Sequence, residues 1–172
     1  MKLSIVVQSG WLLACAALLV SAGAQAQNAS PEVAQSLRPP AGQVLKLKLQ
    51  GSGVQIYQCT DGTWKFQAPE AKLTDEHGRV LGKHYAGPTW ESIDGSTVVG
   101  EVKAHEDGPD PRAIPWLLLQ AKSTSGNGVF SHVRSIQRLQ TTGGKAPSTA
   151  CDASNANQMA RVPYTAQYYF YE

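Results

Sequence analysis

Residues 82–100 read G-K-H-Y-A-G-P-T-W-E-S-I-D-G-S-T-V-V-G, and no other run of the chain gathers so many special residues. A histidine, a tyrosine, a tryptophan and two acids share it with the pairs Gly-Pro and Asp-Gly. These pairs form turns because their backbone geometry favours them. Sequence typical of a strand leads in at 80–85 and leads out at 97–102. We therefore predict a compact double turn between two strands.

The double turn holds five candidate binding residues: His84, Tyr85, Trp90, Glu91 and Asp94. An aromatic ring beside carboxylates is typical of a sugar site, and two carboxylates are also the groups that hydrolyse glycosides. A histidine that titrates near neutral pH can serve as a general base. The alternatives are that the tryptophan is a core residue, the aspartate bonds to its own turn, and the histidine bonds to the turn backbone.

Strand periodicity extends on both sides of the double turn. Residues 44–49 alternate apolar and basic, and Gly-Ser-Gly at 51–53 interrupts the pattern before a second apolar run at 54–59. We predict a hairpin there. Further strands are expected at several places downstream, namely 63–66, 97–103, 114–121, 129–139 and 164–172.

Residues 114–121 form the most apolar run after the N-terminal segment and predict a strand covered on both faces. No stretch of useful length shows the 3.6-residue periodicity of a helix. The expected fold class is therefore all-β, a sandwich or partly closed barrel of about nine strands.

The N-terminal region predicts export. A lysine at position 2, an apolar segment and Ala24-Gln25-Ala26 fit a signal peptide over residues 1–26. The alternative is lipid attachment at Cys15, which follows Leu-Leu-Ala. Residues 27–43 are polar and proline-rich and predict a flexible tether, which leaves 44–172 as a single β-rich domain. The expected location is periplasmic or extracellular.

Charge argues against one class of partner. The 172 residues carry a net charge of +2 and contain no basic run, so nucleic-acid binding is not expected. No transmembrane segment is expected in the mature chain. The partner classes that remain are a small molecule, a glycan or an envelope protein.

Two cysteines, Cys59 and Cys151, follow the expected cleavage site. In an exported chain they predict one disulfide, and the alternative is a pair of buried free thiols.

Four segments of the chain form a recognisable set. The first is the run G-x-H-Y-A-G-P-T-W-E-x-x-D-G-S at 82–96, followed by I-P-W-L-L-L at 114–119, I-Q-R-L-Q-T-T-G-G-K-A-P at 136–147 and V-P-Y-T-A-Q-Y-Y-F-Y at the C-terminal end. Together they resemble the DUF3455 family of uncharacterised secreted proteins. The resemblance implies secretion, one β-rich domain and a cysteine pair, and it implies no activity. Some members carry the name malate dehydrogenase, but this chain lacks the G-x-G-x-x-G motif and βαβ alternation of a dinucleotide-binding fold.

Two further residues are candidates for binding. Trp116 lies in the apolar run, and Arg138 lies beside a Thr-Thr-Gly-Gly turn whose backbone N–H groups could bind an anion. The alternative for the arginine is an ion pair with an acid at the end of a strand. The acidic loop 105–110 lacks the ligand spacing of a calcium site, so we expect no metal and no cofactor.

Taken together, the sequence predicts an exported, non-enzymatic β-domain that binds a ligand or partner. The alternative is an envelope carbohydrate hydrolase that uses Glu91 and Asp94.

Overall fold

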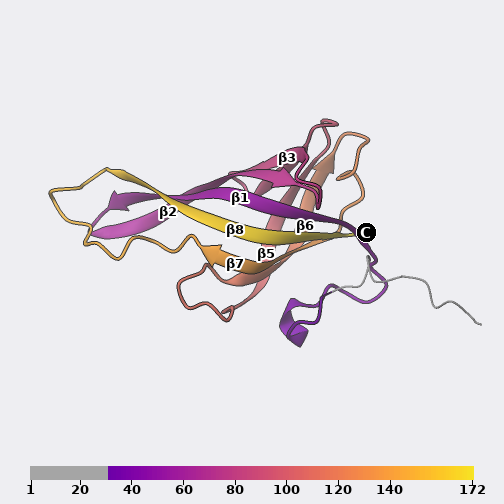
Figure 1. Ribbon diagram of the computed structural model, residues 1–172, viewed down its shortest axis with the longest axis horizontal. Coiled ribbons are helices and arrows are strands. Elements are labelled where there is room, and N and C mark those ends of the chain that lie inside the picture. The colour runs from indigo at the N-terminus through magenta and orange to yellow at the C-terminus, as the bar shows by residue number, and fades with distance from the viewer. Residues whose placement is uncertain (1–30) are drawn as a thin grey trace, which may run out of the picture.

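The computed structural model describes residues 31–172 (Figure 1). The elements are a short 3-10 turn, η2 (Gln35–Leu37), and eight strands: β1 (Leu45–Thr60), β2 (Thr63–Thr74), β3 (Val80–Tyr85), β4 (Thr89–Ser92), β5 (Thr97–Glu106), β6 (Trp116–Ser125), β7 (Ser135–Gly143) and β8 (Met159–Tyr171). The predicted signal peptide and Cys15 lie outside the described residues. Within those residues, no helix is long and apolar enough to cross a membrane.

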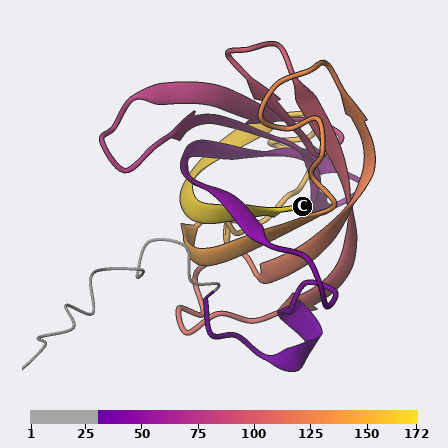
Figure 2. The same cartoon turned by 90° about the vertical axis from the view of Figure 1, so that its right-hand side faces the viewer.

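The eight strands form one antiparallel sheet that closes on itself. Each strand pairs with the next in the chain, and β8 pairs with both β7 and β1. Figure 2 looks along the resulting barrel, in which the strands form a ring. The all-β prediction is confirmed, and of its two architectures the structure has the barrel. It has eight strands where the sequence suggested about nine.

The predicted hairpin at 51–53 is wrong, because β1 runs straight through this segment. A Cβ on Gly51 would lie 2.5 Å from the Cε2 atom of Tyr168, and one on Gly53 would clash with the backbone of β2 at Glu70 and Ala71. The two glycines therefore permit close approach within the sheet, one of the ordinary uses of glycine in a strand. They do not mark a turn.

The double turn of 82–100 is present, but it contains a strand that the sequence analysis missed. The turn after β3 includes a cis Gly87-Pro88 bond, and the second turn includes Asp94-Gly95. Between them β4 pairs with β3, so that His84 lies directly opposite Trp90. Four residues suffice for this strand because both of its neighbours are antiparallel hairpin partners.

The apolar run 114–121 packs against other residues on both faces, although Gln120 is exposed and the strand itself begins at Trp116. Leu119 lies in the core inside the barrel. Leu118 and Trp116 point to the outer face and pack in a second cluster that includes Leu37. This two-sided burial explains why the run is apolar without alternation. The strand predicted at 129–139 begins later, at Ser135.

Residues 31–43, the described part of the predicted tether, lie against the outside of the barrel (Figure 2). Leu37 is fully buried there. Its carbonyl accepts a 2.6 Å hydrogen bond from the buried Gln137 amide, and Ser36 donates a 2.6 Å bond to Glu106. An apolar anchor and two hydrogen bonds thus place this segment on the barrel.

The predicted disulfide is present. Cys59 and Cys151 are joined, and their Cα atoms lie 5.4 Å apart. The bond ties the long loop between β7 and β8 to the end of β1, and the indole of Trp64 adds a 2.9 Å hydrogen bond to the Thr149 carbonyl. Loops of this length are uncommon in compact domains unless something holds them.

Replacing both Cys59 and Cys151 with serine should lower the free energy of unfolding by about 4 kcal/mol, because the bond closes a long loop in the unfolded chain. Urea unfolding of the double variant and of the parent under oxidising conditions measures the difference. Equal stability of the two proteins would contradict a structural role for the bond.

Candidate ligand-binding site

A cavity of about 310 Å³ occupies the lumen of the barrel. All eight strands contribute to its wall, which includes Gln55, Phe66, Gln67, Pro69, His84, Trp90, Val102, Leu117, Leu119, Arg138 and Tyr168, together with Gly87 and Pro88 of the β3–β4 turn. Its volume falls at the lower end of the range typical of small-molecule sites. We call it the lumen cavity.

The two ends of the barrel differ. The lumen cavity reaches the end that carries the β3–β4 turn, where Pro88 and the half-exposed Phe66 line it. Toward the other end the core is filled by Phe130, which is fully buried and packs on Phe170 with the ring centroids 4.7 Å apart. The cavity thus lies toward the end with the β3–β4 turn, and the core is filled toward the other end.

An aromatic cluster forms the inner wall of the cavity. The rings of His84 and Trp90 stack with centroids 4.4 Å apart and planes 13° apart. Tyr168 meets both rings edge-on, at 5.2 Å from His84 and 5.6 Å from Trp90. The stack follows directly from the register, since the two residues face each other across β3 and β4 and both side chains point inward.

His84 is neutral at physiological pH. Its side chain is only 3% exposed, and burial lowers its pKa from 6.5 to about 3. Its Nδ1 lies 2.8 Å from the Thr89 carbonyl, which can only accept, so Nδ1 carries the proton. The Nε2 atom is therefore an acceptor, and no hydrogen bond to it occurs among residues 31–172.

Two buried donors on the cavity wall also lack good partners. Trp90 is 1% exposed, and its indole Nε1 has no hydrogen-bond partner in the described chain. The amide of Gln55 lies close enough to the Tyr164 hydroxyl to lower that group's pKa, which burial raises, but its Nε2 makes no hydrogen bond of good geometry. Buried polar groups are nearly always paired, so each such exception needs an explanation.

Arg138 brings a charge to the same cavity. Its Nη2 and Nε donate to the Pro115 carbonyl at 2.8 and 3.2 Å. No carboxylate of the described residues forms an ion pair with it. Burial lowers its pKa, but an arginine retains its charge at neutral pH. The hypothesis of an ion pair with an acid is therefore wrong for this residue.

Tyr85 and Glu91 lie on the outer face of the sheet, apart from the lumen cavity. The tyrosine hydroxyl donates a 2.8 Å hydrogen bond to Glu91, and Lys83 lies 3.1 Å from the same carboxylate. The Tyr85 hydroxyl first, and then Lys83, lower the pKa of Glu91. A carboxylate held in its ionised form by these partners is poorly suited to act as a general acid.

Asp94 lies in the β4–β5 turn, and hydrogen bonds to neighbouring residues occupy its carboxylate. It accepts hydrogen bonds from the Ser96 hydroxyl and backbone N–H and, across to the next loop, from the Val129 N–H. These bonds, the Ser96 hydroxyl first, lower the pKa of Asp94 to about 2. The Ser96 hydroxyl in turn accepts from the N–H of Phe130, so this network holds the residue that fills the closed end.

Of the seven predicted site residues, the lumen cavity brings together His84, Trp90 and Arg138. Trp116 faces outward into the cluster around Leu37, although its buried Nε1 also lacks a partner among the described residues. Three lining residues that the sequence analysis did not select are Gln55, Leu117 and Tyr168. No local signal marks them, because the apolar neighbours Val54 and Ile56 suggest that Gln55 faces outward, and Leu117 and Tyr168 look like ordinary core residues.

A model of the family described as "Protein of unknown function (DUF3455)" matches residues 40–172. The chain belongs to the DUF3455 family. The match covers all eight strands and leaves out η2. No curated protein and no solved structure shows significant similarity to the chain.

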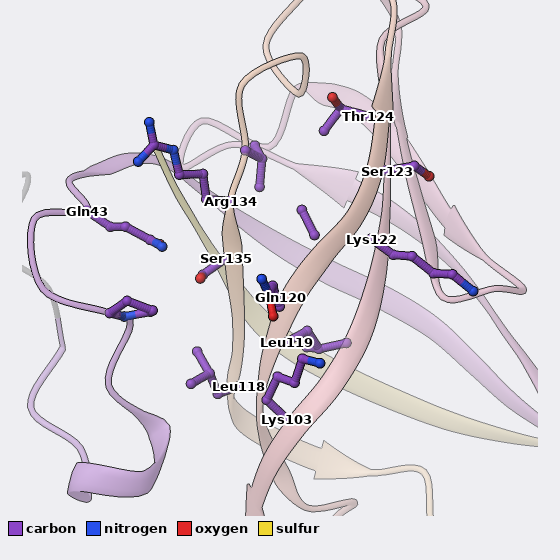
Figure 3. A pocket seen from close by; sticks show the side chains of 13 residues that line it. Gln43, Lys103, Leu118, Leu119, Gln120, Lys122, Ser123, Thr124, Arg134 and Ser135 are labelled. Atoms are coloured by element: carbon purple, nitrogen blue, oxygen red, sulfur yellow. The ribbon is translucent and has the colours of Figure 1, made fainter.

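A second hollow of about 520 Å³ lies on the outside of this DUF3455 domain, between residues 40–43 and strands β5 to β7. Figure 3 shows Gln43 facing Arg134 and Ser135 across it, with Lys103 and Lys122 on the neighbouring strands. Its charged groups are those of an ordinary solvated surface, so it is a weaker candidate than the lumen cavity.

A metal centre has no support in the part of the chain that the structure describes. No group of three or more histidine, cysteine, aspartate or glutamate residues is arranged to hold an ion there. In the acidic loop, Asp110 pairs with Arg112 at 3.1 Å and Glu106 accepts from Ser36.

Trp90→Ala should lower the free energy of unfolding by about 3–5 kcal/mol, because a fully buried indole leaves a large void when it is removed. Trp90→Phe should cost clearly less, since a ring still packs on His84. Chemical denaturation of both variants tests this. A Trp90→Ala protein as stable as the parent would contradict a core role.

Stability should depend on pH through His84. The unfolded chain takes up a proton below about pH 6.5, whereas the folded chain resists protonation of His84 until about pH 3. The free energy of unfolding should therefore fall as the pH drops, with about 3 kcal/mol of the loss at pH 4 due to this residue. His84→Asn keeps a donor for Thr89 but cannot titrate.

Urea unfolding of the parent and of His84→Asn at pH 7 and pH 4 isolates this contribution. The acidic groups contribute equally to both proteins, so the parent should lose more stability than the variant. The same loss in both proteins would show that His84 is not buried in its neutral form.

Proposed function

We propose that this DUF3455 protein is an exported, non-enzymatic binding protein that holds a small molecule in the lumen of its barrel. The observation that carries the proposal is the lumen cavity itself. It has an apolar wall with unpartnered polar atoms on Trp90, Gln55 and His84, and it holds the guanidinium of Arg138, which has no acid partner among the described residues. A concave, largely preformed apolar site with a few convergent polar groups is the usual form of a ligand site.

The unpartnered groups support a ligand rather than a packed core. An unpaired buried donor costs about 1–3 kcal/mol and is uncommon in a folded protein, yet two such donors belong to residues of this one cavity wall. The two donor atoms themselves have essentially no accessible surface, so the acceptor atoms of a ligand would reach them only after a small shift of the Trp90 and Gln55 side chains. The apolar side chains of Leu117, Val102 and Phe66 would cover the rest of its surface.

The carbohydrate hydrolase has less support. Glu91 points away from the lumen and Asp94 is occupied in its turn, so the two carboxylates do not line one cleft. The low pKa of each carboxyl also leaves neither as a proton donor near neutral pH. A glycosidase needs one of its two carboxyl groups protonated.

The disulfide supports the export part of the proposal. Disulfides form and persist in oxidising compartments such as the bacterial periplasm and the extracellular space. The Cys59–Cys151 bond suits either compartment, and we propose that the protein acts in the periplasm or at the cell envelope.

A matched pair of variants on β6 tests the proposed function. Leu117 lines the lumen cavity, whereas Gln120 lies on the outer face and lines the external hollow. Leu117→Trp should fill the cavity and abolish binding, while Gln120→Trp places the same ring outside and should leave binding unchanged. The measurement is a thermal-shift screen of small metabolites and short glycans on the parent protein, followed by calorimetry of each hit on both variants.

Hits that bind Leu117→Trp as well as they bind the parent would contradict a lumen site. Loss of binding in Gln120→Trp alone would place the site in the external hollow instead.

A further inference from the structure

We infer that the ligand of the lumen cavity is a small carboxylate with an apolar body, whose carboxylate pairs with Arg138. This inference rests on the proposed function and adds the chemical class of the ligand. Its basis is that the only cationic side chain on the cavity wall has no acid partner among residues 31–172.

The guanidinium of Arg138 is held in place, but only some of its N–H donors form hydrogen bonds. Arg138 sits on β7 directly opposite Leu117 of β6 on one side and Tyr168 of β8 on the other, and all three residues line the cavity. The Pro115 carbonyl takes hydrogen bonds from Nε and Nη2 and fixes the plane of the group. Arginine has five N–H donors, so Nη1 and the second hydrogen of Nη2 remain available.

The positive charge of Arg138 affects the pKa values of three other side chains of the barrel interior. Burial raises the pKa of Tyr168 and of Tyr164, and the charge of Arg138 acts in the opposite direction on both. The same charge adds to the burial that lowers the pKa of His84. An electropositive, weakly solvated pocket favours an anion over a neutral or cationic ligand.

The single positive charge and the small number of donors on the cavity wall indicate a carboxylate in preference to a phosphate. One guanidinium matches one carboxylate in a two-pronged arrangement and neutralises a single negative charge. Besides Arg138, the unpartnered wall donors are the single indole N–H of Trp90 and the Gln55 amide. The remaining wall, formed by Leu117, Leu119, Val102 and Phe66, suits a hydrocarbon or aromatic body.

The arginine is retained at a cost to folding. A partly buried charge without a counter-ion disfavours the folded state, and replacing such a charge by an apolar side chain of similar length is often neutral or stabilising. Arg138→Met should therefore fold, which makes it usable in a binding test. Arg138→Lys keeps the charge but loses the two-pronged geometry and serves as the conservative control.

The experiment compares acids with their uncharged amides. The probes are benzoate, 3-phenylpropanoate, hexanoate and octanoate, each beside its carboxamide, titrated by calorimetry at neutral pH into the full secreted protein. We expect at least one acid to bind about tenfold to a hundredfold more tightly than its amide. Arg138→Met should remove that preference, Arg138→Lys should reduce it, and Leu117→Trp should abolish binding of both members of the pair.

Each other outcome overturns a specific statement. Amides that bind as tightly as the acids, with binding lost in Leu117→Trp, would overturn the carboxylate assignment and leave the lumen site standing. A preference for the acids that survives in Arg138→Met would overturn the role of this arginine. Phenyl phosphate binding more tightly than every acid would show that the anion is a phosphate. Failure of every probe, charged and neutral, to bind would count against both the carboxylate and the lumen site.

Discussion

The pairing of β8 with β1 is the constraint on which the rest of the structure depends. It runs from Leu45 opposite Tyr171 to Gln58 opposite Met159 and converts an eight-stranded meander into a ring. A ring has no free edge, so its backbone groups are paired without help from another chain. It also has an inside, and only in this closed form do the inward residues of β3, β6 and β7 face a common space.

Closure of the barrel buries polar side chains in its interior. His84 remains neutral there, and its Nδ1 donates to the Thr89 carbonyl. Arg138 cannot lose its charge, and it keeps only the Pro115 carbonyl as an acceptor. The two residues therefore differ in how burial is compensated, His84 by neutrality and Arg138 by a single carbonyl. A neutral ring stacked on Trp90 stabilises the core, whereas a cation without a counter-ion contributes little to it.

Loops are held by specific bonds at both ends of the barrel, and the cavity opens at one of these ends. At one end the Asp94 network links the β4–β5 turn to the β6–β7 loop and holds Phe130 in the core. At the other end the disulfide and Trp64 fix the long β7–β8 loop to the β1–β2 hairpin, and the cavity opens beside the β3–β4 turn.

The sequence by itself determined the β class, the turns at Gly87-Pro88 and Asp94-Gly95, the two-sided burial of the β6 run and the cysteine pair. Each of these depends on local backbone geometry, on periodicity or on a count of residues, which a sequence carries explicitly. It also selected His84, Trp90 and Arg138 as candidates, but beside Tyr85, Glu91, Asp94 and Trp116, which point elsewhere.

Only the tertiary structure decided which candidates line one cavity, because Arg138 is 54 residues from His84 along the chain and the two meet only through the ring. Gly51 and Gly53 show the same limit. The local sequence predicts a turn, whereas the structure shows that glycine is needed here because Tyr168 and the neighbouring strand β2 approach too closely for a side chain. Whether a side chain faces the lumen or the outside depends on strand register, and register is set by partners that are distant in sequence.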